Sequence, residues 1–225
     1  MAVEIEVRES ATRLRARRLW YAALFAVALA SLVAQTLLVV QGGTDVNASE
    51  AAPAGLAVRL VRLASYFTIQ SNVLVLAVSL LLMLRPGRDG PLLRVLHLDA
   101  LLGIAVTGLV FAIVLAPLID PEGVAAAVNA GLHVVSPIAA VLGWILVGPR
   151  GWVDRQVIGR AFLWPVAWIA YTLAHGALTG WYPYPFLDVA ELGYPRSLLN
   201  IAVVLAVAFA LALVALWADR RLARR

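Results

Sequence analysis

The sequence predicts an all-α polytopic membrane protein, a helical bundle that forms one integral membrane domain over residues 1–225. Apolar residues make up 63% of the chain and charged residues 14%, whereas soluble proteins average roughly 45–50% and 25%. The apolar residues also form blocks near the ~17–25 residues that a membrane-spanning helix requires. Such blocks are too long for the strands of a membrane barrel, and a lipid-exposed backbone must bond to itself.

Six apolar blocks predict six transmembrane helices. The first block is too long for the apolar region of a signal peptide, so we expect it to be a span. Pro86, Pro121 and Pro149 follow the second, third and fourth blocks, and proline interrupts helices. The expected spans are residues 20–40, 63–84, 98–117, 123–147, 161–178 and 199–217.

The segment between the fifth and sixth blocks, Trp181–Asp188, is rich in aromatic residues. Pro183 and Pro185 exclude a regular helix here. Aromatic rings suit the membrane interface, so the segment is either an interfacial anchor or a lid over a cavity that opens outward.

The charged residues predict the orientation. All basic residues are Arg, and all but Arg59, Arg62 and Arg196 fall on one side of the six spans. The positive-inside rule places both termini in the cytoplasm. The net charge of +5 is therefore a topology signal, and we expect no nucleic-acid partner. We expect the bacterial cell membrane; the glycosylation sequon Asn47–Ser49 has meaning only in a eukaryotic secretory pathway.

Hydrogen-bonding side chains occur at two places within the expected membrane. The run Tyr66–Asn72 begins in the second block, and His133 is isolated in the fourth. Thr68 lies 17 residues before Arg85, and His133 lies 17 residues before Arg150. At 1.5 Å per residue both side chains sit ~25 Å above the inner boundary. Equal depth is necessary for contact between them, though not sufficient.

A hydroxyl beside an imidazole is the minimal activated nucleophile. Thr68 and His133 are therefore the candidate catalytic pair, with Ser71 as the rival hydroxyl. No acidic residue lies at their depth, so we expect a dyad oriented by Asn129 or another amide; Asp188 contributes only if its loop folds inward. The candidates for substrate binding or oxyanion stabilisation are Gln70, Ser71, Asn72, Asn129, Asn200, Tyr171, His175 and Trp181.

Other readings of these residues remain open. Small and polar residues also pack membrane helices without any further role. A binding or transport protein would use the same polar interior, with more weight on His97 and Asp99. His133 and His175 could ligate haem iron. A metalloenzyme is disfavoured by three scattered histidines and the lack of cysteine, so we expect neither a metal nor a cofactor.

The chain resembles the androgen-induced-gene-one family of six-helix membrane proteins, and more closely its bacterial Pr-six-Pr branch. The resemblance covers most of the chain and is carried by Phe67-Thr68 with Gln70-Ser71-Asn72, by His133 with Pro137, and by Trp181–Asp188. Eukaryotic members are threonine-dependent hydrolases of fatty-acid esters of hydroxy fatty acids, and their essential Thr and His correspond to Thr68 and His133. This chain departs from the eukaryotic pattern at Gln70-Ser71-Asn72.

The resemblance implies an intramembrane threonine-dependent hydrolase that acts on a membrane lipid ester. The alternative function is a membrane binding or transport protein for a small or lipidic ligand. The sequence does not indicate an oligomeric state.

Overall fold

The computed structural model describes residues 2–42 and 55–224, and no β-strand occurs among them. Six helices in these residues are long and apolar enough to cross a membrane, which confirms the expected all-α fold and number of spans. The sequon Asn47–Ser49 lies outside the described residues. The candidate spans are Ala11–Val40, Phe67–Leu84, Pro91–Leu118, Gly123–Val147, Arg155–Thr179 and Val189–Leu222.

The described helices are α1 (Ala2–Val40), α2 (Leu56–Ser65), α3 (Phe67–Leu84), α4 (Pro91–Val110), η1 (Phe111–Leu115), η2 (Ala116–Leu118), α5 (Gly123–Ala130), η3 (Gly131–Val135), α6 (Ser136–Val147), α7 (Arg155–Ala161), α8 (Leu163–Thr179), η4 (Pro185–Leu187) and α9 (Val189–Leu222). Several exceed their expected bounds because hydropathy marks only the apolar part of a helix. Helix α4, for example, begins with Pro91 at its first position, where proline is favoured.

The expected helix over residues 63–84 is wrong at its start. Tyr66 is extended, with ψ of 129°, and it separates α2 from α3. The polar side chains of α2 therefore do not lie on one continuous helix face with Thr68 and Asn72 of α3. Thr68 instead lies in the first turn of α3, where backbone N–H groups have no partner within the helix.

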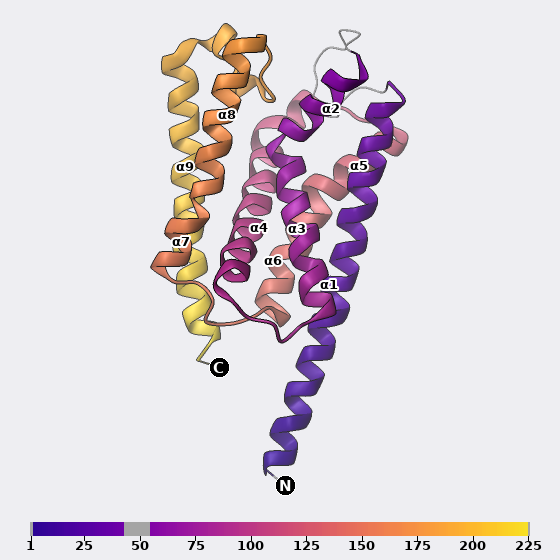
Figure 1. The fold of residues 1–225 in the computed structure, drawn as a ribbon, viewed down its shortest axis with the longest axis vertical. Coiled ribbons are helices and arrows are strands. Elements are labelled where there is room, and N and C mark those ends of the chain that lie inside the picture. The colour runs from indigo at the N-terminus through magenta and orange to yellow at the C-terminus, as the bar shows by residue number, and fades with distance from the viewer. Residues whose placement is uncertain (1, 43–54, 225) are drawn as a thin grey trace.

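Helix α4 lies between two groups of helices (Figure 1). Helices α1, α3 and α6 pack together on one side, and α7 and α9 contact α4 from the other. Both termini lie at the same end of the bundle (Figure 1). At that end the buried Asp219 carboxylate accepts hydrogen bonds from the Gly151 and Val153 amides at 3.1 and 2.9 Å, which ties α9 to the loop before α7.

The described residues include two short π-helical segments whose side chains are in direct contact. Segment η1 follows α4, and η3 lies between α5 and α6. The backbones approach closely beside them, since a Cβ added at Gly108 would come within 2.9 Å of Pro137. Such segments are frequent at functional sites, and here each contributes one ring of the stacked pair Phe111 and His133, whose centroids are 4.4 Å apart.

Candidate functional site

Thr68 and His133 are in contact, as we expected from their matched depth and from the family resemblance together. The Thr68 Oγ1 lies 3.3 Å from the Nε2 of His133. The two side chains are only 3% and 2% exposed. Helix α3 and segment η3 therefore bring together a hydroxyl and an imidazole that are 65 residues apart in sequence.

The contact of the other ring nitrogen of His133 determines which of the two ring nitrogens carries the hydrogen. Nδ1 lies 3.2 Å from the backbone carbonyl of Asn129, and a carbonyl only accepts, so Nδ1 carries the hydrogen. Burial against Phe111 favours the neutral ring, because an unpaired charge in an apolar site is costly. The Nε2 lone pair therefore accepts the Thr68 hydroxyl hydrogen. This is the arrangement that a general base requires.

Tyr184 adds a second hydroxyl to the site, at a residue that was not among the candidates from sequence. Its oxygen lies 3.2 Å from the Oγ1 of Thr68 and 3.1 Å from the Thr68 backbone nitrogen. Since the Thr68 hydroxyl hydrogen points to His133, the Tyr184 hydroxyl is the donor to Oγ1. The only signal for this role was the Pro183-Tyr184-Pro185 sequence, in which prolines fix the backbone beside the tyrosine.

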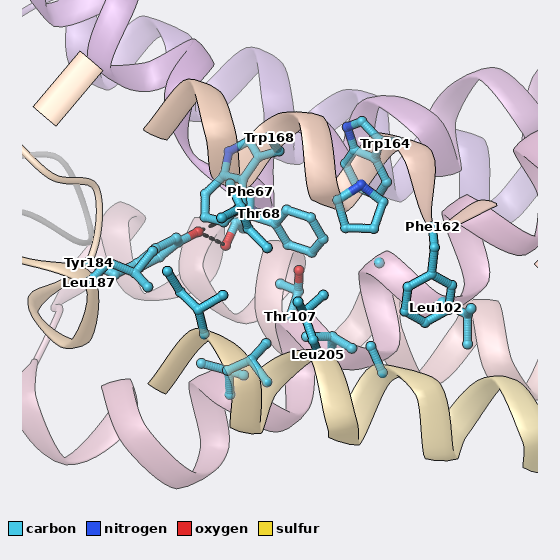
Figure 2. Close-up of a pocket in the computed structure, with 18 of the residues that line it drawn as sticks. Phe67, Thr68, Leu102, Thr107, Phe162, Trp164, Trp168, Tyr184, Leu187 and Leu205 are labelled. Carbon is cyan, nitrogen blue, oxygen red and sulfur yellow. Dashed lines mark hydrogen bonds between the residues drawn. The ribbon is translucent and has the colours of Figure 1, made fainter. Parts of the chain in front are cut away.

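Thr68 and Tyr184 line a long cavity between α3, α4, α8 and α9 (Figure 2). The cavity encloses about 840 Å³ of empty space, including its open mouth, and its walls are mostly aliphatic and aromatic. His133 does not line it. The Thr68 hydroxyl thus separates the imidazole from the cavity, with a base behind it and room for an apolar ligand in front.

Ser71, the rival hydroxyl, points elsewhere. Its Oγ accepts a hydrogen bond of 3.4 Å from Thr107 of α4. The structure therefore pairs His133 with Thr68.

The side-chain NH2 groups of Asn72 and Gln70 on α3 make structural hydrogen bonds. The Nδ2 of Asn72 donates to the carbonyls of Thr68 and Leu132 at 2.9 and 3.2 Å, which ties α3 to η3 beside the pair. The Gln70 Oε1 accepts a 3.1 Å hydrogen bond from Trp164, and its Nε2 donates to α2. Asn72 thus holds the site together, whereas Gln70 links α3 to α8.

Asn129 and Asn200 act at the edges of the site. Asn129 orients His133 through its backbone carbonyl rather than through the amide expected. The Nδ2 of Asn200 donates to the Phe186 carbonyl at 2.8 Å and so fixes the segment that carries Tyr184. Asp188 caps α9, with its Oδ1 accepting from the Ala190 and Glu191 amides.

The remaining candidate residues, Tyr171, His175 and Trp181, lie beside α2. Tyr171 shares a 2.7 Å hydrogen bond with Ser65. His175 and Trp181 line a separate hollow with Arg62, whose guanidinium lies 5.2 Å from the Trp181 ring centroid. The hydrogen bonds and the ring contact of His133 given above do not involve His175. No group of three potential metal ligands occurs in the described part of the chain.

Trp181 packs edge-on against Tyr66, which in turn packs edge-on against Tyr184; both centroid distances are 5.6 Å. The 180–188 segment thus packs against Tyr66, directly before the first turn of α3.

No protein-family model, no curated protein and no solved structure matches the chain.

Proposed function

We propose that this protein is an intramembrane threonine-dependent hydrolase of lipid esters. The observation that carries the proposal is the Thr68–His133 hydrogen bond of 3.3 Å at the wall of an apolar cavity. A buried hydroxyl whose hydrogen is held by an imidazole, and whose oxygen faces space for a ligand, has the requirements of a nucleophile.

In the first half of the reaction Thr68 Oγ1 attacks the acyl carbon of the ester, and His133 Nε2 takes the hydroxyl proton. The Asn129 carbonyl supports the imidazolium that results, because Nδ1–H already donates to it. The tetrahedral intermediate then collapses, the ester C–O bond breaks, and His133 returns the proton to the leaving alcohol. An acyl-threonine remains.

In the second half His133 takes a proton from a water molecule, whose oxygen attacks the acyl-threonine. The Oγ1–acyl bond breaks and Thr68 regains its proton from His133. The products are a fatty acid and a regenerated enzyme.

Two features support charge stabilisation on the acyl oxygen. The Tyr184 hydroxyl lies within 3.2 Å of Oγ1 and can turn to the oxyanion once Oγ1 has bonded to the acyl carbon in the tetrahedral intermediate. Thr68 is also in the first turn of α3, where the helix dipole favours negative charge.

The family and the orientation are part of the proposal. Six spans, the Thr68–His133 pair and the Trp181–Asp188 segment together support membership of the androgen-induced-gene-one family and its Pr-six-Pr branch. The Arg distribution supports cytoplasmic termini in a bacterial cell membrane. The pair then lies in the outer half of the bilayer.

Lipid binding or transport without catalysis is the second candidate. The cavity supports it, because its mostly apolar walls and open mouth suit a lipid chain whether or not Thr68 reacts.

Labelling of the purified protein with a fluorophosphonate probe separates the two. We expect modification at Thr68 by mass spectrometry, loss of labelling in Thr68→Ala and His133→Ala, and unchanged labelling in Ser79→Ala, which removes another buried hydroxyl of α3. Equal labelling of wild type and Thr68→Ala would favour the binding function.

A further inference from the structure

Asp99 of α4 lines the same cavity as Thr68. Asp99 is only 7% exposed. Within the described residues its carboxyl group makes no hydrogen bond or ion pair. The proposed reaction at Thr68 does not use it.

An unpartnered carboxyl in such a place costs stability. Polar groups buried without a hydrogen bond are destabilising, and ionisable residues within membrane spans are rare and tend to be functional. Its neighbours along the cavity, including Leu102 and Phe162, are apolar. A carboxyl that faces a ligand cavity without a protein partner is suited to bind a polar group of the ligand.

Asp99 lies far from the reacting hydroxyl. The Thr107–Ser71 hydrogen bond shows that these two residues lie at the same height along α4 and α3. Asp99 is eight residues inward from Thr107, and Thr68 is three residues outward from Ser71, which together correspond to roughly 16 Å along the helices. Figure 2 shows Thr68 and Tyr184 at one end of the cavity and Leu102 and Phe162 at the other.

We propose that Asp99 binds a hydroxyl group at the far end of a long-chain lipid whose carbonyl lies at Thr68. The inference rests on the proposed function for the position of the carbonyl. A ligand hydroxyl is favoured over an ammonium group because two desolvated charges repay their desolvation only with excellent geometry and further hydrogen bonds, and the described lining offers Asp99 no additional polar neighbour within bonding distance.

The consequence is selectivity by length. A hydroxyl held at Asp99 fixes how deeply the chain enters the cavity, and the carbonyl reaches Thr68 only when the chain between them has the matching length. Asp99 is therefore a specificity-determining residue, and it has no part in the bond-breaking steps.

Binding of long-chain methyl ketones tests this without catalysis, because a methyl ketone has no ester bond to hydrolyse. Isothermal titration in micelles would compare ketones with and without a terminal hydroxyl, over a series of chain lengths. We expect the wild type to bind the hydroxylated ketone roughly tenfold more tightly at one length, the gain of about one buried hydrogen bond.

The variants separate the possible causes. Asp99→Leu should bind both ketones equally and unfold at a higher temperature when no ligand is bound. Asp99→Asn should retain the preference, and Asp89→Leu, a change in the exposed loop before α4, should match the wild type.

Equal binding of the two ketones by the wild type, or a preference that survives Asp99→Leu, would overturn the proposal. Tighter binding of an amine-terminated ketone that is lost in Asp99→Asn would assign a cationic ligand instead. If the protein prefers the hydroxylated ketone but has no esterase activity, the role of Asp99 in hydroxyl binding stands and only the proposed hydrolase function is wrong.

Discussion

The Tyr184 hydroxyl contacts Thr68 at two atoms, the Oγ1 at 3.2 Å and the backbone nitrogen at 3.1 Å. The two residues are 116 positions apart. The contact holds the 180–188 segment against the first turn of α3. It also places a hydrogen-bond donor beside the atom that we propose reacts.

Tyr184→Phe tests that donor. The ring and its packing remain, but the hydroxyl is lost, so we expect kcat for ester hydrolysis to fall by roughly 100-fold with a smaller change in KM. Tyr194→Phe, at a residue that is 53% exposed, is the matched control and should leave both constants unchanged. An unchanged kcat in Tyr184→Phe would remove Tyr184 from the mechanism.

Gly108→Ala tests the close approach of α4 to the π-helical segment that carries His133. The new Cβ would lie 2.9 Å from Pro137 and 3.3 Å from the His133 carbonyl. Proline is rigid, so the backbones must separate, and we expect a loss of about 1–3 kcal/mol in unfolding free energy together with reduced activity.

Gly159→Ala is the control for that change, since nothing lies within 4 Å of the place that its new methyl group would occupy. It should be neutral or slightly stabilising, because alanine favours helix more than glycine does. Thermal unfolding in detergent would measure both variants. Equal melting temperatures would show that the helices can separate at Gly108 without cost.

Equal depth and the family resemblance together predicted the contact between Thr68 and His133 but not its surroundings. Thr68 and His133 were placed at equal depth because the rise of a helix is constant and because Arg85 and Arg150 mark the inner boundary. The break at Tyr66 has no local signal, and the only local signal for the role of Tyr184 is the pair of prolines that flank it. Tyr66 is not a helix-breaking residue type; it is 2% exposed, and packing against Trp181 and Tyr184 accompanies its extended conformation.

Trp181→Ala tests whether the 180–188 segment acts as a lid. Removal of the indole takes away the edge contact with Tyr66, so we expect a several-fold higher KM for long-chain esters and a smaller effect on kcat. Trp217→Ala removes an indole that is 61% exposed on α9 and should leave KM unchanged. A normal KM in Trp181→Ala would favour the interfacial anchor.

Reporter fusions test the orientation. Fusions at Gly43, Gly90, Gly123, Gly151 and Asp188 should report outside, inside, outside, inside and outside, since six spans with cytoplasmic termini place successive loops on alternate sides. Two adjacent fusions that report the same side would contradict the topology.

The most direct test of the Thr68 assignment is the turnover of long-chain acyl esters in detergent micelles by wild type and Thr68→Ala. We expect Thr68→Ala and His133→Ala to lose activity to a similar degree, and the double variant to be little worse, because residues that act as one nucleophilic unit are strongly non-additive. Thr68→Ser should retain part of the activity, since the hydroxyl survives. Hydrolysis by Thr68→Ala at the wild-type rate would show that Thr68 is not the nucleophile.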